Sequence, residues 1–176
     1  MRTVLRVTIV AVIAAAAALA QNSDVATRWA NWKPFLGTWE GIGGGAPGQG
    51  KGSFTFAPDL QGVVLTRRNY SEYPARKDRA AYRHDDFVVI YLDADKKTRA
   101  DYWDNEDHLI HYTIDFTDNG DRMVWVSDPA QSGPRFRLTY AKTAADALSL
   151  KFEIAPPNAP TEFKTYVEAA AKRTAK

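Results

Sequence analysis

Short segments of β-type sequence follow one another along most of the chain, and turn-forming residues separate them. The segments are rich in β-branched and aromatic residues, and several alternate apolar with polar positions, as strands with one buried face do. The expected strands are residues 38–42, 52–57, 63–70, 86–93, 98–103, 108–116, 121–127, 135–141, 147–154 and 163–171. Such direct succession, with few helical patterns between the segments, predicts an all-β antiparallel barrel of about ten strands.

Two parts of the chain also carry helical spacing. Val25, Trp29, Trp32 and Phe35 are three or four positions apart, which predicts a short amphipathic helix within residues 22–35. Residues 163–171 fit either a helix or a strand. We expect a strand there, because a barrel needs its last strand to pair with its first and so remove both open edges.

The N-terminus has the pattern of an export signal. Arg2 and Arg6 precede an apolar stretch from Val7 to Ala18, and residues 18–20, Ala-Leu-Ala, have the small-x-small form of a signal-peptidase site. The stretch is shorter than the roughly 20 residues that cross a bilayer. We expect residues 1–20 to be a signal peptide cleaved before Gln21, residues 21–176 to be a single domain, and the location to be periplasmic or secreted. A retained membrane anchor is the alternative.

Charge and cysteine content exclude several classes of function. Removal of residues 1–20 takes Arg2 and Arg6 from the 23 basic residues, which leaves 21 against 21 acidic ones. A nearly neutral domain gives no reason to expect a nucleic-acid or anionic-membrane partner. The chain has no Cys, which excludes disulfides, thiol catalysis, thiolate metal sites and lipid attachment through a thiol. The fold must therefore be stabilised by packing.

His108 and His111 lie in one expected strand and face opposite sides of the sheet, because alternate residues of a strand point to opposite faces. They cannot form a metal pair, since this spacing converges on a helix and not on a strand. His108 shares its face with Ile110 and Tyr112, so we expect it to point inward near the barrel mouth. It is either a hydrogen-bonded structural histidine or a general base.

An acidic and histidine-containing group flanks two further strands. His84, Asp85 and Asp86 open one strand, and Asp104 and Glu106 follow another. If these segments meet, they could hold a hard cation or a single metal ion. The alternative is that they are solvated charges at strand ends, which keep strand edges soluble.

Arginine pairs occur in two strands, Arg67 with Arg68 and Arg135 with Arg137. An arginine that points into a barrel is costly unless paired, and its planar donors suit a ligand carboxylate. In the alternative interpretation, Arg135 and Arg137 face solvent, while the apolar residues that alternate with them fill the interior.

The segment Leu-Gly-Thr-Trp-Glu-Gly-Ile-Gly at residues 36–43 resembles the opening strand of nitrobindin-like and lipocalin-like barrels, which include an exported bacterial family of unknown function. Residues 73–75, 102–106, 108–112 and 152–157 resemble that exported family. The resemblance implies a lipocalin-like, calycin-type barrel. Nitrobindins bind haem through a histidine near the C-terminus, but this chain has no histidine after His111, so the haem ligand is not carried over and no cofactor is expected.

We expect an exported protein that holds a small hydrophobic or amphipathic ligand inside the barrel. The candidate ligand-binding residues are Trp39, Arg68, Tyr70, Trp103, His108, Tyr112 and Arg137. No catalytic triad with a nucleophile elbow, phosphate-binding loop or dinucleotide fingerprint is present, so no catalytic residue and no metal ligand is assigned.

Two other functions compete with ligand binding. One is an enzyme that uses His108 with Asp104 or Glu106 as acid and base. The other is an envelope interaction module with a filled barrel and an exposed apolar patch around Trp29, Trp32 and Phe35. The ligand and the oligomeric state stay open at the level of sequence.

Overall fold

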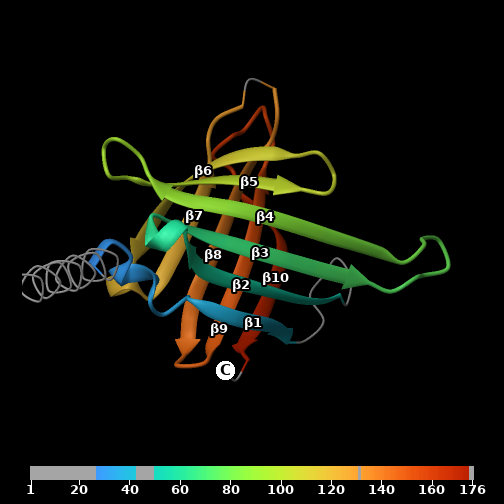
Figure 1. The fold of residues 1–176 in the computed structure, drawn as a ribbon. Coiled ribbons are helices and arrows are strands. Elements are labelled where there is room, and N and C mark those ends of the chain that lie inside the picture. Colours follow the sequence, from blue (N-terminus) through green and yellow to red (C-terminus); the bar gives the residue numbers. More distant parts are fainter. Residues whose placement is uncertain (1–26, 43–49, 131, 175–176) are drawn as a thin grey trace, which may run out of the picture. The chain divides into compact units, whose positions relative to one another are not determined.

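Ten antiparallel strands form a closed barrel in the computed structural model, which describes residues 27–42, 50–130 and 132–174 (Figure 1). The strands are β1 (Gly37–Ile42), β2 (Lys51–Asp59), β3 (Val64–Tyr73), β4 (Tyr82–Leu92), β5 (Thr98–Asp104), β6 (Leu109–Thr117), β7 (Arg122–Ser127), β8 (Arg135–Ala144), β9 (Ala147–Ala155) and β10 (Lys164–Arg173). Each strand pairs with the next in sequence, and β1 pairs with β10. The predicted ten-stranded barrel is therefore confirmed, including the last strand.

Residues 27–33 belong to a separate short unit. It contains the 3-10 helix η1 (Ala30–Trp32), and Trp29 packs edge to face on Trp32 with ring centroids 6.2 Å apart. In the described part of the predicted amphipathic helix, η1 is only a three-residue 3-10 turn, so that prediction is not met there. The predicted export signal and residues 22–26 lie outside the described residues.

Hairpin turns alternate between the two ends of the barrel, because every strand is antiparallel to its neighbours. One end carries the 3-10 turns η2 (Leu60–Gly62) and η3 (Asp118–Gly120), and we call it the η end. In η3, Asn119 and Gly120 have φ angles of 55° and 91°, which Asn and Gly tolerate better than other residues. The other end, which carries turns 74–81, 105–108 and 156–163, is called the mouth.

The interior toward the η end is filled by aromatic side chains. Phe54 and Phe56 of β2 pack on Tyr140 of β8 with ring centroids 5.4 and 5.5 Å apart, and Phe56 also packs on Trp125. Buried aliphatic side chains surround this cluster: Leu65, Val88, Ile90, Met123 and Leu148. Close packing of this kind supplies the main stabilisation of a chain without disulfides.

The seam between β1 and β10 closes the barrel through Arg173. Its guanidinium donates hydrogen bonds to the carbonyl oxygens of Leu36 and Pro34 and lies 4.0 Å from the centre of the Trp39 ring. The Trp39 indole N–H donates to the carbonyl oxygen of Phe35 at 2.8 Å. The first and last strands are thus joined by side chains as well as by the backbone ladder.

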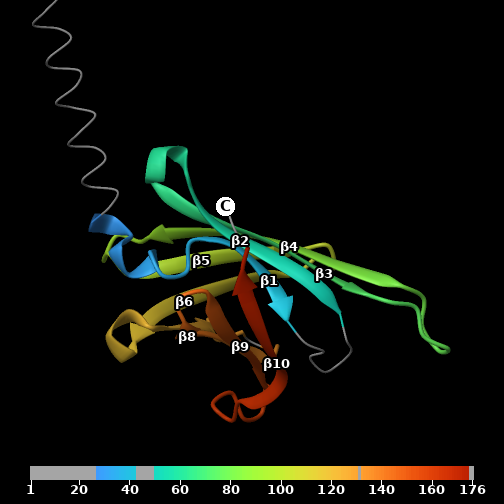
Figure 2. The same ribbon diagram turned by 90° about the horizontal axis from the view of Figure 1, so that it is seen from below.

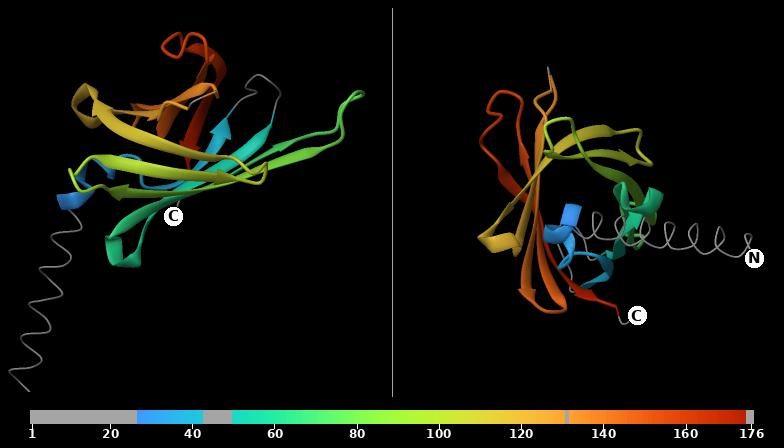
Figure 3. Two further views of the ribbon diagram at one scale, coloured as in Figure 1. Left: turned by 90° about the horizontal axis from the view of Figure 1, so that it is seen from above. Right: turned by 60° about the vertical axis from the view of Figure 1, so that its left-hand side comes forward.

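The β3–β4 hairpin reaches past the neighbouring strands at the mouth (Figures 2 and 3). The ladder between β4 and β5 begins only at Asp86, four residues after β4 itself begins. Tyr73 and Tyr82 form the outermost pair of the β3–β4 ladder, and their rings stack with centroids 6.0 Å apart. The hairpin therefore places the first residues of β4 at the rim of the barrel.

Candidate functional site

The barrel interior holds a buried arginine, Arg67 of β3. It shares the inner face with Leu65 and is only 5% exposed. Its Nη2 donates to Asp86 Oδ1 at 2.5 Å, and its Nη1 donates to the Tyr140 hydroxyl at 2.5 Å. Because β3 and β8 are five places apart in the ring of ten strands, the bond to Tyr140 spans the barrel. The buried Nε of Arg67 has no hydrogen-bond partner among the described residues.

Asp86 of β4 is the counter-ion of Arg67. Its second oxygen accepts a hydrogen bond from the Asn69 side chain at 2.7 Å, and His84 Nε2 lies 3.6 Å from the same oxygen. Burial alone would raise the pKa of Asp86, but the positive charge of Arg67 and the polar contacts with His84 and Asn69 lower it below its usual range. Asp86 is therefore ionised at neutral pH.

His84 connects Asp86 to the rim of the mouth. Its Nδ1 lies 3.0 Å from Glu106 Oε1, and its Nε2 lies 3.0 Å from the Tyr102 hydroxyl. Asp86 and then Glu106 raise the pKa of His84 to about 9, against the opposing effect of burial. His84 is therefore protonated at neutral pH, and both ring nitrogens donate.

The network ends in the turn between β5 and β6. The Tyr102 hydroxyl donates to Asp104 at 3.1 Å, and Asp104 also accepts the backbone N–H groups of Glu106 and His108. At the rim, the Tyr82 hydroxyl donates to Glu106, and burial together with this bond raises the pKa of Tyr82 to about 12.

These groups form one continuous set that we call the mouth network. It consists of Arg67, Asn69, Tyr82, His84, Asp86, Tyr102, Asp104 and Glu106. The pKa values of its three carboxyl groups all lie below their usual range, and its cations are Arg67 and His84. At neutral pH the network thus carries one more negative than positive charge.

An apolar wall faces the mouth network across the barrel. Strand β9 is five places from β4 in the ring of strands, and the register puts Phe136, Leu138, Phe152 and Ile154 of β8 and β9 on the inner face. Phe136 and Phe152 stack with centroids 5.8 Å apart. All four are only partly buried although they point inward, so solvent reaches the interior at the mouth. The mouth half of the barrel therefore has one polar and one apolar wall.

His84, Asp86, Asp104 and Glu106 lie close together, as the sequence suggested they could. They form a hydrogen-bonded network. No group of three or more His, Asp or Glu side chains in the described parts of the chain is arranged to hold a metal ion. Asp85, the remaining member of the predicted group, points outward and pairs with Arg83 at 2.8 Å.

Two of the seven candidate ligand-binding residues lie inside the barrel. Trp39 and Tyr112 are both buried in the aromatic packing. Tyr112 packs edge to face on Tyr102, with centroids 6.3 Å apart, and so borders the mouth network. Trp29, Trp32 and Phe35, which were expected in an exposed patch, are all buried, so that expectation is wrong.

Four candidates lie on the outer face of the barrel: Arg68, Tyr70, Trp103 and Arg137. Arg137 forms a two-pronged ion pair with Glu153 at 2.6 and 2.8 Å, so the alternative prediction that it points away from the interior is confirmed. Arg68, Tyr70 and Trp103 line one groove together. None of the four contributes to the interior.

The prediction that His108 points inward is wrong. β6 begins at Leu109, so His108 belongs to the preceding turn, where strand alternation no longer sets its direction. Its side chain is 58% exposed, and Nδ1 lies 2.9 Å from Asp104 Oδ2. His84 occupies the inward position that was expected for His108.

Comparison with known proteins supports the architecture. No family model and no curated protein matches the sequence. Among solved structures, the crystal structure of Rv2717c from M. tuberculosis is similar, with a TM-score of 0.57 and 15% sequence identity over 84% of this chain and 98% of that one. At this identity the likeness concerns the fold alone. No helix in the described residues is long and apolar enough to span a membrane.

Proposed function

We propose that this protein is an exported binding protein that holds a small amphipathic molecule in the mouth half of its barrel. The carrying observation is the two-sided interior, in which the mouth network faces the half-exposed wall of Phe136, Leu138, Phe152 and Ile154. Inward apolar side chains that meet water gain free energy when a ligand covers them. The apolar part of the ligand lies on that wall, and its polar group lies on the network.

The charges of the network define the polar group of the ligand. Asp104 and Glu106 stand at the rim with lowered pKa values, and the network has one excess negative charge. A fatty-acid carboxylate would be repelled there, whereas a neutral or cationic group that donates hydrogen bonds is favoured. The expected ligand is thus an amphiphile without an acidic head.

The test is native mass spectrometry of residues 21–176 purified from a bacterial periplasm. We expect a bound mass of lipid size that is lost on denaturation, and expression of the whole chain should give a mature protein that begins at Gln21. Leu138→Trp fills the inner face and should abolish the bound mass. The matched control is Thr139→Trp, which places the same ring on the outer face of the same strand. A ligand-free protein, also after incubation with a total lipid extract, would contradict the proposal.

A second candidate function is acid–base catalysis by His84. The supporting observation is that its imidazolium contacts both Glu106 and the Tyr102 hydroxyl at 3.0 Å, which is the geometry of a positioned proton donor. A screen with chromogenic esters, phosphoesters and glycosides tests this function. Turnover that disappears in His84→Gln but persists in His108→Gln would favour the enzyme, and no turnover on any of them would favour the binding protein.

A further inference from the structure

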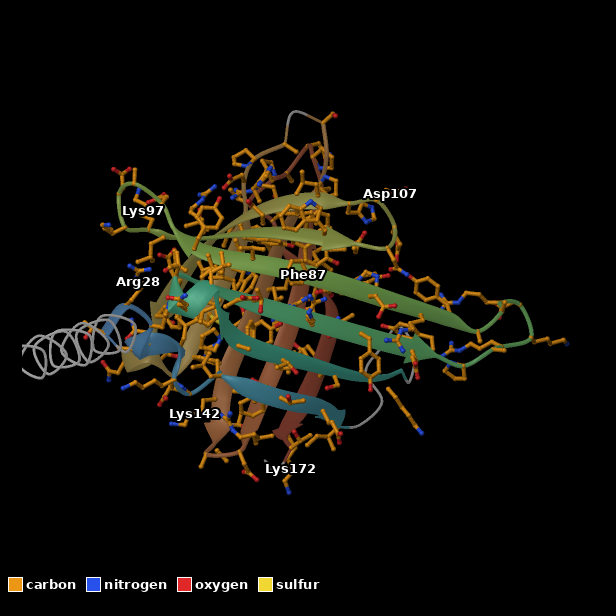
Figure 4. The ribbon with its side chains drawn as sticks, viewed as in Figure 1. Arg28, Phe87, Lys97, Asp107, Lys142 and Lys172 are labelled. Atoms are coloured by element: carbon orange, nitrogen blue, oxygen red, sulfur yellow. The ribbon has the colours of Figure 1, made fainter. Side chains whose placement is uncertain are left out.

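A groove of about 520 Å³ lies on the outer face of strands β2 to β5. Its floor is one row of side chains in direct register across the four strands, namely Thr55, Arg68, Phe87 and Trp103. Phe87 lies on β4 within this row (Figure 4). The row is separate from the mouth network, because Phe87 and Asp86 are neighbours on β4 and point to opposite faces of the sheet.

Arg68 supplies an uncommitted positive charge in this groove. Its guanidinium carbon lies 4.6 Å from the centre of the Phe87 ring, which holds the group in place. No hydrogen bond or ion pair joins the Arg68 side chain to another residue in the described part of the chain. Arg83 in the same groove differs, because Glu72 and Asp85 occupy its donors.

Trp103 supplies an apolar surface beside this charge. The residue is 41% exposed, and its register partner on β6, Leu109, is 53% exposed. The two form a continuous apolar surface on the outer face, next to Phe87. Neighbouring apolar side chains that stay in water mark a site for a ligand or a partner more often than isolated ones do.

Polar groups on β2 complete the groove. Ser53 and Thr55 line its far side, and the Thr55 hydroxyl is held 2.8 Å from the Thr38 hydroxyl. The groove thus runs from hydroxyl groups, through an arginine with free donors, to an aromatic surface. The Asp85 carboxylate also lines the groove, but it is paired with Arg83.

We propose that this groove binds a small planar molecule in which an aromatic ring carries a carboxylate. The ring packs on Trp103, and the carboxylate accepts two N–H bonds from Arg68, whose planar donors match its two oxygens. The Arg68 guanidinium lies over Phe87, and Trp103 is the next side chain of the row, so a single small molecule reaches both. The site does not depend on the interior ligand, because it uses the other face of the sheet.

The test follows the indole N–H signals of ¹⁵N-labelled residues 21–176 by NMR during titration with benzoate. The Trp103 signal is assigned with Trp103→Phe. We expect a saturable shift of this signal, with weaker binding of benzyl alcohol, which lacks the charge, and of acetate, which lacks the ring.

Variants separate the two parts of the site. Arg68→Gln should weaken benzoate binding about tenfold, the loss expected for a charge-assisted pair of hydrogen bonds. Arg68→Lys, which keeps the charge without the planar donors, should lie between this variant and the wild type. The matched control is Arg122→Gln, which lies on the outer face of β7 and is paired with Asp118; it should bind as the wild type does.

Three results would overturn the proposal. They are the absence of a saturable shift at Trp103, an unchanged benzoate affinity in Arg68→Gln, and acetate or benzyl alcohol binding as tightly as benzoate. Because Arg68 and Trp103 are exposed, the variants should fold, and their ligand-free spectra check this.

Discussion

At the scale of single residues, the ion pair of Arg67 and Asp86 is buried in the interior, where breaking it is costly. Arg67→Met leaves the Asp86 carboxylate buried without its counter-ion, so we expect a loss of about 3–5 kcal/mol in the free energy of unfolding. The double variant Arg67→Met/Asp86→Leu removes both charges and should recover most of this loss. Urea unfolding of the variants measures both effects. A single variant as stable as the double would show that the two charges are not coupled.

His84 should make stability depend on alkaline pH. Its pKa in the folded protein is about 9, above the value near 6.5 for an unfolded chain. The folded state therefore binds this proton more tightly, and its contribution is complete below about pH 6.5 and is lost as pH rises through about 9. We expect a loss of roughly 3 kcal/mol between pH 6 and pH 10, measured by urea unfolding. His84→Gln should flatten this dependence, whereas His111→Gln, at an exposed position, should retain it.

Alternation within a strand could have identified the interior charges from the sequence. Leu65 points inward, so Arg67, two positions later, must share its face, and Val88 places Asp86 inward in the same way. This was not evident from the sequence, because Arg67 and Arg68 are equally polar. Polarity alone therefore does not show which of the two faces the interior. The position of His84 near a strand end suggested a solvated charge, and only the meeting of β4 with the β5–β6 turn shows its partners.

At the scale of elements, the strands could be predicted and their extensions could not. Strand centres follow from alternating apolar residues and from turn residues between them, and all ten are confirmed. β4 begins four residues earlier than expected, at Tyr82, because its first residues pair only with β3 and carry charged side chains. The spacing of hydrophobic residues predicts only strand residues that face the core, so it does not predict the part of a hairpin that extends beyond the core.

The closing seam depends on one side chain of β10. Arg173→Ala removes two hydrogen bonds to carbonyl oxygens and the contact with Trp39, so we expect a loss of about 2–3 kcal/mol. The adjacent Lys172 makes only a long, exposed ion pair with Asp146, and Lys172→Ala should cost less than about 0.5 kcal/mol. Guanidinium unfolding of the two variants compares them. Equal losses would show that backbone pairing alone closes the barrel.

At the scale of the whole barrel, the two ends differ in packing. The η end is filled by the aromatic cluster around Tyr140, whereas inward side chains at the mouth remain partly exposed. A ten-stranded barrel is wider than the eight strands that side chains alone just fill, so one end can stay open while the other is packed. The Arg67–Tyr140 bond crosses the interior between these two regions.

This difference between the two ends predicts which segments an interior ligand protects from hydrogen exchange. A molecule that binds only the folded barrel raises its thermal midpoint, and the rise grows with the logarithm of the ligand concentration above Kd. In hydrogen exchange, the ligand should slow exchange in segments 82–86 and 135–138, which form opposite walls of the mouth, by more than the general slowing that stabilisation of the folded state gives segment 123–125 of the packed end. The comparison uses the protein as purified and the same protein after its ligand has been extracted. Equal slowing in all three segments would mean that the ligand stabilises the barrel globally and would contradict a site confined to the mouth.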